Sequence, residues 1–245
     1  MRELRVPVEG LREGPFELDP AASRYVSRVN RLAAGDRFVA FDPDARLEAE
    51  ARVVRVGRRA VVCELAAPRA AALIAKRPLW LLQGLCKGER FDQVVRDATA
   101  LGVTDIVPVG LARCDVKLTD GSAARPKRWA RIAVEAARQC GRGDVARLYP
   151  HVDLTRAMAQ VPGDALRICL WELATEPLAS LASEMARATS IALLIGPEGG
   201  LESVEVQRAR QAGFRSASLG PFILRTETAA TATLGAVMAM WGWAG

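Results

Sequence analysis

The spacing of apolar and polar residues divides the chain into two parts. In the first seventy or so residues, apolar positions alternate with polar ones in short runs, which is typical of strands with one buried face. Leu4, Val6 and Val8 share one face of such a run. Further strands are expected over residues 36–41, 48–56 and 60–65, and one helix over residues 21–33. This part predicts a small β-barrel or β-sandwich, and residues 66–78 are expected to form a connector.

From Pro78 onward, short continuously apolar runs alternate with segments whose apolar residues recur at helical spacing. Strands are expected at 78–84, 105–109, 166–171, 191–195 and 216–219, and helices at 90–101, 126–140, 177–188 and 203–212. This alternation predicts a mostly parallel sheet covered by helices on both faces. Ligands of such sheets bind beyond the carboxyl ends of the strands, so we look for chemistry in the loops after Trp171, Ile195 and Leu219.

The chain carries no charge after Glu227, where it reads TAATATLGAVMAMWGWAG. This stretch is rich in Thr, Ala and Gly, which makes it a poor membrane-spanning helix. A helix that is apolar on all sides is usually buried in a core or an oligomer interface. The N-terminus has charges at Arg2, Glu3 and Arg5 and lacks the apolar core of a secretory signal. We therefore expect a cytoplasmic protein without a membrane anchor.

Composition excludes several kinds of metal and redox site. A single histidine, His151, excludes a multi-histidine metal site, and it lies in a loop with no motif of a nucleophilic triad nearby. The five cysteines are scattered without a CxxC pair, so we expect reduced thiols and no bound metal. The net charge of +6 favours a polyanionic partner only weakly. The first 72 residues hold 13 arginines against 11 acids, so a nucleic-acid-binding face there would depend on the placement of charges.

A glycine-rich turn, GPEGG, occupies residues 196–200 directly after an apolar run. Glycine permits positive φ and a close approach of the backbone to a ligand. The turn lacks the GK[ST] of a Walker loop, and it does not match the GxGxxG dinucleotide motif. Two interpretations remain open, a small-molecule pocket and a tight turn from strand to helix.

The sequence Arg225-Thr226-Glu227 opens the last helix. Thr226 is a suitable N-cap, and Glu227 is favourably placed in the first turn. Arg225 is unfavourably placed, because the helix dipole disfavours a cation at the N-terminal end of a helix. We therefore expect Arg225 to have an anionic partner or a role toward substrate. Two other basic segments, 86–90 and 138–142, are interpreted either as phosphate contacts or as ordinary loop and helix-end residues.

These segments, in this order, resemble the RsmE family of SPOUT-class methyltransferases. The resemblance rests on KGER (87–90), LGVTDIVPV (101–109), ARCDVKL (112–118), RWARIAVEAARQCGR (128–142), LLIGPEGGL (193–201) and LGPFILRTETAA (219–230). It covers nearly all of residues 78–245 and is weaker before them. Two positions depart from the family pattern: Ala100 replaces a usual Glu, and Val29-Asn30-Arg31 replaces Val-Leu-Arg.

The resemblance implies a fold and a reaction. The fold is α/β, with a PUA-like RNA-binding β-barrel over residues 1–72 and a SPOUT-type parallel-sheet methyltransferase domain over 73–245, whose C-terminal part forms a trefoil knot. The implied reaction is methylation of N3 of a uridine in small-subunit (16S) ribosomal RNA, as naked RNA or in the assembled subunit. The implied cofactor is S-adenosylmethionine, and the implied assembly is a homodimer packed through the last helix.

The resemblance also implies roles for particular residues. The cofactor pocket is assigned to Leu170, Glu172, Gly196, Gly200, Leu219, Gly220, Ile223, Leu224 and Thr228. Arg225 is expected to stabilise negative charge on the uracil, with Glu227 or Glu198 orienting it or accepting the proton. RNA contacts are expected from Lys87, Arg90, Arg138 and Arg142.

Two other functions fit parts of the same pattern. A 2′-O-ribose methyltransferase of the same class would also have a Gly-Glu-Gly turn, but it typically carries Ser-Leu-Asn where this chain has Ile223-Leu224-Arg225. A non-enzymatic ribosome-assembly factor would bind RNA through the barrel and would bind no cofactor. The methylated nucleoside distinguishes the first alternative, and cofactor binding distinguishes the second.

Overall fold

The structure is a computed structural model that describes residues 3–115 and 124–242. The chain forms two compact units. The N-terminal unit comprises Met1–Ala75 together with Val134–Val145, and the C-terminal unit comprises Lys76–Ala133 together with Ala146–Gly245. The N-terminal unit therefore includes a segment from the middle of the chain, residues 134–145, whereas the expected contiguous domains 1–72 and 73–245 place this segment in the second domain.

The N-terminal unit is built on one six-stranded sheet with the order β1-β3-β4-β5-β2, and β6 pairs with β4. The strands are β1 (Arg5–Pro7), β2 (Gly14–Glu17), β3 (Arg37–Asp42), β4 (Leu47–Val56), β5 (Val61–Leu65) and β6 (Arg69–Ala70). Its core contains Val6, Val26, Phe38 and Cys63, each at most 1% exposed. Alternating apolar residues of the strands supply this core, as the sequence pattern predicts.

Three elements of this unit differ from expectation. The helix expected at 21–33 is shorter, with α1 (Pro20–Arg24) followed by one π-helical segment, η1 (Tyr25–Val29). It ends there because the backbone turns left-handed at Arg31, where φ is 56°. Strand β2 was missed because it contains proline, which an edge strand tolerates. The expected connector contains β6.

The C-terminal unit is built on a sheet in which every strand pairing is parallel. The order is β10-β8-β7-β12-β11-β13, and β9 pairs with β8. The strands are β7 (Leu79–Gly84), β8 (Asp105–Gly110), β9 (Arg147–Leu148), β10 (Val152–Asp153), β11 (Leu166–Leu170), β12 (Ile191–Ile195) and β13 (Arg215–Ala217). The predicted parallel sheet is confirmed.

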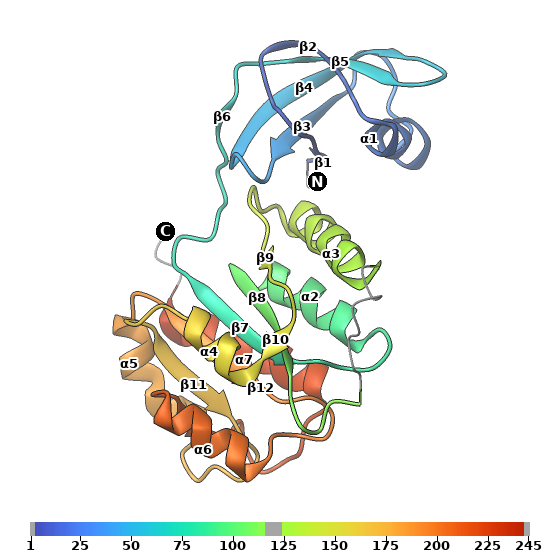
Figure 1. The fold of residues 1–245 in the computed structure, drawn as a ribbon. Helices are drawn as coiled ribbons and strands as arrows, with labels where there is room; N and C mark the ends of the chain where they lie inside the picture. Colours follow the sequence, from blue (N-terminus) through green and yellow to red (C-terminus); the bar gives the residue numbers. More distant parts are fainter. Residues whose placement is uncertain (1–2, 116–123, 243–245) are drawn as a thin grey trace. The chain divides into compact units, whose positions relative to one another are not determined.

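Helices cover both faces of this sheet (Figure 1). The helices of this unit are α2 (Arg90–Ala100), α4 (Leu154–Gln160), η2 (Leu178–Leu181), α5 (Ala182–Arg187), α6 (Ser203–Gln211) and α7 (Thr226–Trp241). Helix α3 (Ala124–Cys140) begins in this unit and continues from Val134 into the N-terminal unit. On one face, Trp80 and Leu82 of β7 share a core with residues of α4 and α6. The last helix, α7, packs against β12, α2 and α5. Both faces of β7 and β12 are therefore buried, which explains why β12 is entirely apolar and β7 is apolar except at Gln83.

The sequence pattern missed β9, β10 and α4. The two strands have only two residues each, too few to show a period. Helix α4 had a signal, because Asp153 caps it by accepting a hydrogen bond from the backbone N–H of Arg156 at 2.9 Å. No helix within the described residues has the length and apolar character needed to cross a membrane.

Candidate functional site

Loops that follow β11, β12 and β13 enclose a cavity at the carboxyl edge of the parallel sheet. The cavity has a volume of about 280 Å³. Its lining combines the first residues beyond β11, the glycine-rich turn after β12, the loop after β13 and the start of α7. This is the place where open parallel sheets bind ligands, and it is the place predicted from the order of the elements.

The glycine-rich turn forms one wall, and its glycines leave little room for side chains; a Cβ atom on Gly199 would lie 2.8 Å from Cβ of Arg113. A Cβ atom on Gly196 would lie 3.0 Å from the carbonyl carbon of Gly200. Gly200 has a φ of +73°, and a Cβ atom there would lie 3.1 Å from Oε1 of Glu172. The turn is therefore both tight and part of a pocket, so the two interpretations of its sequence are compatible.

The loop between β13 and α7 forms a second wall and exposes large apolar side chains at the rim. Phe222 is 81% exposed and Ile223 is 86% exposed, while both line the cavity. Apolar side chains exposed beside a cavity are a common feature of ligand-binding and interaction surfaces.

Most residues assigned to the cofactor pocket line this cavity. Eight of them do so: Leu170, Glu172, Gly196, Gly200, Leu219, Gly220, Ile223 and Leu224. Thr228 is absent from the lining and is exposed on α7, whereas Ala229 lines the cavity. Residues 226 and 229 are three apart and share a helical face, which turns residue 228 away. Thr228 is therefore the one assigned pocket residue that does not face the cavity.

The start of α7 also differs from expectation. Arg225, not Thr226, is the N-cap residue, and its side chain makes no capping hydrogen bond. Thr226 is 4% exposed, and its Oγ1 donates a 2.7 Å hydrogen bond to the carbonyl of Gly196. Arg225 is exposed, and its guanidinium makes no hydrogen bond or ion pair with any residue that the structure describes. The anionic partner expected for Arg225 is therefore not supplied by the described part of the chain.

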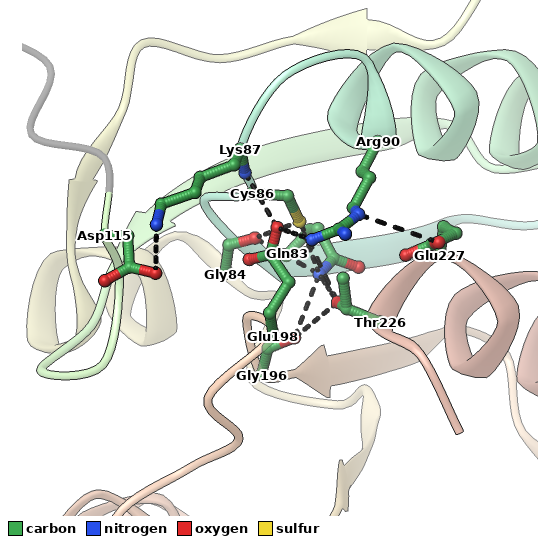
Figure 2. Close-up of polar contacts among 10 residues, drawn as sticks. All are labelled: Gln83, Gly84, Cys86, Lys87, Arg90, Asp115, Gly196, Glu198, Thr226 and Glu227. Atoms are coloured by element: carbon green, nitrogen blue, oxygen red, sulfur yellow. Dashed lines mark hydrogen bonds and ion pairs between the residues drawn. The ribbon is translucent and has the colours of Figure 1, made fainter. Parts of the chain in front are cut away.

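The two candidate carboxylates lie on either side of Arg90 (Figure 2). Nη1 of Arg90 is 2.8 Å from Oε1 of Glu198, and its Nε is 3.9 Å from Oε1 of Glu227. The backbone N–H of Lys87 also donates to Oε1 of Glu198, at 2.9 Å. Glu198 lines the cavity, whereas Glu227 does not. Oε2 of Glu227 is buried and has no hydrogen-bond partner among the described residues.

These contacts decide the acidity of Glu198. Burial by itself would raise the pKa of this carboxyl, but the hydrogen bonds from Arg90 and from the Lys87 N–H outweigh burial and lower the pKa below its ordinary value. Glu198 is therefore ionised at neutral pH and is a weak proton acceptor.

The four basic residues expected to contact RNA have different surroundings. Nζ of Lys87 lies 2.8 Å from Asp115 at the surface, and Arg90 pairs with the carboxylates described above. In the N-terminal unit, the guanidinium of Arg138 stacks over the ring of Tyr25 at 3.8 Å. Arg142 is 3% exposed and forms two 2.9 Å hydrogen bonds to Asp144. The side chain of Arg142 is therefore buried and bound, which leaves it little surface for a contact with RNA.

The described cysteines are free, and no group of metal-ligating side chains occurs in the described parts of the chain. Burial raises the pKa of Cys169 to about 12, and burial likewise raises that of Cys86 to about 12, with a smaller opposing effect from its hydrogen bond to Thr226. Both thiols are therefore protonated at neutral pH.

One residue of the site was missed by the sequence analysis. Gln83 is fully buried near the end of β7, where its amide joins the glycine-rich turn to the start of α7 (Figure 2). The sequence did carry a signal, because Gln83 is the only hydrophilic side chain in the strand LWLLQG.

Comparison of the sequence with known proteins identifies relatives that are RNA methyltransferases. A family model described as an RNA methyltransferase domain matches residues 75–238. The ribosomal RNA small subunit methyltransferase E of Mycobacterium bovis is 32% identical over 87% of this chain and 82% of its own length. The protein of that name from Bacillus subtilis is 27% identical over 93% of this chain and 91% of its own length.

Two solved structures share the fold. One, from Legionella pneumophila, is described as a methyltransferase in complex with the bound cofactor SAM; it has a TM-score of 0.88 and 30% identity, and the match covers 98% of both chains. A ribosomal RNA small subunit methyltransferase E from Neisseria gonorrhoeae, bound to S-adenosyl methionine, has a TM-score of 0.88, 27% identity and the same coverage. The expected fold class, an α/β SPOUT-type domain with a small N-terminal β-domain, is confirmed. From these likenesses and the matching family model, the chain belongs to the RsmE family of RNA methyltransferases.

Proposed function

We propose that this protein uses S-adenosylmethionine to methylate N3 of a uridine in small-subunit (16S) ribosomal RNA. The observation that supports this most directly is the cavity at the carboxyl edge of the sheet, whose lining includes eight of the nine residues assigned to the cofactor. Family membership supplies the class of reaction. The relatives described above are named ribosomal RNA small subunit methyltransferase E, which supplies the class of RNA. We place the reaction in the cytoplasm.

The residues of the cavity suit this cofactor. The turn around Gly196 and Gly200 leaves backbone atoms accessible where side chains would clash, so N–H and carbonyl groups can bind an adenine and a ribose. Leu219 and Ile223 supply apolar surface for the purine ring, and Glu172 is a hydrogen-bond acceptor beside Gly200. When bound, the cofactor supplies a methyl group on a sulfonium sulfur, which is a good leaving group.

Arg225 is our candidate for the residue that assists the transfer. Uridine N3 must lose its proton before or during the transfer, and negative charge then develops on the uracil carbonyl oxygens. The exposed guanidinium of Arg225 lies at the start of α7, directly before the cavity-lining Thr226, and makes no bond to any described residue. A cation so placed stabilises that charge, an effect of about 3 kcal/mol by analogy with an oxyanion donor.

The two carboxylates are proposed to act differently. Glu198 is held by Arg90 and the Lys87 N–H, and its lowered pKa makes it a poor acceptor for the N3 proton. We propose that Glu198 fixes the 87–90 segment beside the cavity. Glu227 has an oxygen without a hydrogen-bond partner among the described residues, so it is the better candidate to accept a proton. A pH–rate profile of Glu227→Gln that loses its acidic limb would support this assignment, and an unchanged profile would contradict it.

We propose that the N-terminal unit binds the RNA. Between Asp19 and Asp36 the chain has no acidic residue and carries three exposed arginines, Arg24, Arg28 and Arg31. Arg24 and Arg28 belong to the helical segment α1–η1 and Arg31 lies just beyond its end, so all three exposed cations can contact phosphates. Arg138, stacked on Tyr25 of the same segment, adds a fourth cation.

We also propose that the protein is a homodimer packed through α7. This helix has an almost uncharged sequence, yet Thr228, Ala232 and Ala239 are exposed. Burial of this face against a second copy would remove it from water. Light scattering should then give twice the mass of one chain, and a monomer at micromolar concentration would contradict the proposal.

The reaction is tested by incubating the protein with labelled S-adenosylmethionine and small ribosomal subunits from a strain that lacks this enzyme. Nucleoside mass spectrometry should then show 3-methyluridine. A 2′-O-methylated nucleoside would replace the proposed reaction with ribose methylation. Failure to bind the cofactor in calorimetry would indicate a non-enzymatic RNA-binding protein.

A further inference from the structure

Gln83 is a buried polar residue in an otherwise apolar strand. It is 0% exposed near the carboxyl end of β7, which is paired on both sides, by β8 and β12. A buried amide costs free energy unless its polar atoms find partners, so a hydrophobic residue would stabilise this strand more simply. The partners of Gln83 therefore indicate what its amide contributes.

The amide nitrogen of Gln83 connects three segments that are distant in sequence. Its Nε2 donates to Oγ1 of Thr226 at 3.0 Å, to the carbonyl of Gly196 at 3.2 Å and to the carbonyl of Gly84 at 3.2 Å. Thr226 in turn donates to the same Gly196 carbonyl. Figure 2 shows this cluster together with Arg90 and Glu198. One side chain thus joins the end of β7, the glycine-rich turn and the first residue of α7.

Backbone packing at the same place leaves little freedom for movement. A Cβ atom on Gly84 would lie 2.5 Å from the nitrogen of Pro197 and 2.9 Å from the carbonyl carbon of Gly196. The end of β7 and the glycine-rich turn are therefore in direct backbone contact. A change of a few tenths of an ångström at Gln83 is expected to pass to the turn, because close-packed interiors transmit strain.

We infer that Gln83 is a positioning residue, which aligns the cofactor-binding turn with the catalytic end of α7. Gln83 does not line the cavity, whereas its partners Gly196 and Thr226 do, and Thr226 is adjacent to Arg225. Gln83 therefore acts on the methyl transfer only through these two neighbours. The part of this inference that concerns turnover rests on the role proposed above for Arg225.

The test is a double-mutant cycle between Gln83→Met and Arg225→Ala, with turnover and cofactor affinity measured separately. Methionine approximates the volume of glutamine without its donors. We expect Gln83→Met to lower kcat about 10- to 100-fold in the wild-type background, since small misplacements near a reacting centre have effects of this size. In the Arg225→Ala background the same change should cost less than about threefold, because the aligned group is already missing. Gln207→Met, exposed on α6, is the matched control and should change nothing.

Cofactor binding provides the second readout. Calorimetry should show a Kd for S-adenosylmethionine raised about tenfold in Gln83→Met, because Gly196 loses its hydrogen bond from Nε2. Wild-type turnover and affinity in this variant would overturn the inference, and so would an equal loss of kcat in both backgrounds, which indicates general destabilisation. If Arg225→Ala alone keeps wild-type turnover, the role of Arg225 fails, and the affinity readout still decides the role of Gln83.

A second variant covers the case in which Gln83→Met does not fold. Gln83→Leu removes both amide N–H donors without placing a charge in the buried strand. It should reproduce the loss of turnover and of cofactor affinity. Wild-type behaviour of Gln83→Leu would equally overturn the inference.

Discussion

Helices α2 and α7 pack against each other, and both start beside the same cavity with an arginine, but the two arginines have different surroundings. Arg90, the first residue of α2, lies between the carboxylates of Glu198 and Glu227. Arg225, the N-cap of α7, is exposed and bonds to no described side chain. A cation at a helix N-terminus is unfavourable, so each of them needs a compensating anion.

The difference indicates how the two residues contribute. The anions of Arg90 belong to the protein, so its charge is already neutralised and its contribution is to hold the 87–90 segment and Glu198 in place. Arg225 has no such anion among the described residues, so its charge remains available for a substrate that becomes negative during the reaction. Neither role follows from residue type, because the sequence alone presents two similar arginines.

The largest effect is expected from Arg225→Ala. Turnover should fall about a hundredfold or more, because a donor to the developing negative charge is lost. Cofactor affinity should change little, since Arg225 does not line the cavity. Steady-state kinetics and calorimetry measure the two quantities. Arg208→Ala, an exposed arginine on α6, is the control. Wild-type turnover in Arg225→Ala would remove Arg225 from the mechanism.

A smaller effect is expected from Arg90→Met. Turnover should fall about tenfold, because the 87–90 segment and Glu198 lose their shared hydrogen bond and shift slightly. RNA affinity measured over a series of salt concentrations tests the alternative that Arg90 binds phosphate. An unchanged salt dependence is expected if Arg90 serves its carboxylates. A slope reduced by about one would identify a phosphate contact instead.

A change in the packing between α2 and α7 should alter the stability of the protein without altering its turnover. Oγ1 of Thr231 on α7 donates a 2.9 Å hydrogen bond to Oδ2 of Asp97 on α2. Thr231→Val should lower the free energy of unfolding by about 1 kcal/mol through loss of this bond, with kcat unchanged. Urea denaturation gives the stability. A fall in kcat comparable to that of Arg90→Met would show that the start of α7 depends on this packing.

The smallest effect concerns acid stability. The native pKa of Glu198 is lowered, so its pairing with Arg90 stabilises the fold above the unfolded-state value of 4.5, and this contribution is lost as the pH falls through the lowered native pKa. The difference in Tm between wild type and Arg90→Met should therefore be constant near pH 7 and shrink below pH 4.5. A difference that grows on acidification would contradict the pairing.

Much of the fold and part of the site could be predicted from the sequence. The run 191–195 is apolar throughout and the run 78–84 is apolar except at Gln83, because both faces of these strands are covered; this pattern predicted the parallel sheet. The residues around Gly196 and Gly220 were assigned to the cavity through family motifs. The trefoil knot was likewise expected from the resemblance alone, because the periodicity of apolar residues carries no information about how a chain is knotted. Thr228 was assigned through the same family motifs, but Ala229 rather than Thr228 lines the cavity.

Side-chain pairing was the part that the sequence did not reveal. The pairing of Arg142 with Asp144, two residues apart, buries a guanidinium that composition alone would place at the surface. Glu198 and Arg90 are 108 residues apart, so only the tertiary fold brings them together. Gln83 was overlooked because the strand was identified from its overall apolar character, which a single polar residue does not change.

The inclusion of residues 134–145 in the N-terminal unit has a consequence for the synthesis of the chain. The backbone N–H of Gly143 donates to the carbonyl of Leu73 at 2.7 Å, and the carboxylate of Asp144 accepts from the N–H of Ala75. These bonds cannot form until the ribosome has polymerised and released residue 145. At about 5–20 residues per second, the interval after residue 75 is roughly 4–14 s. During translation, residues 73–75 therefore lack these partners until a segment encoded far downstream has left the ribosome, although every strand of the N-terminal sheet has by then been synthesised.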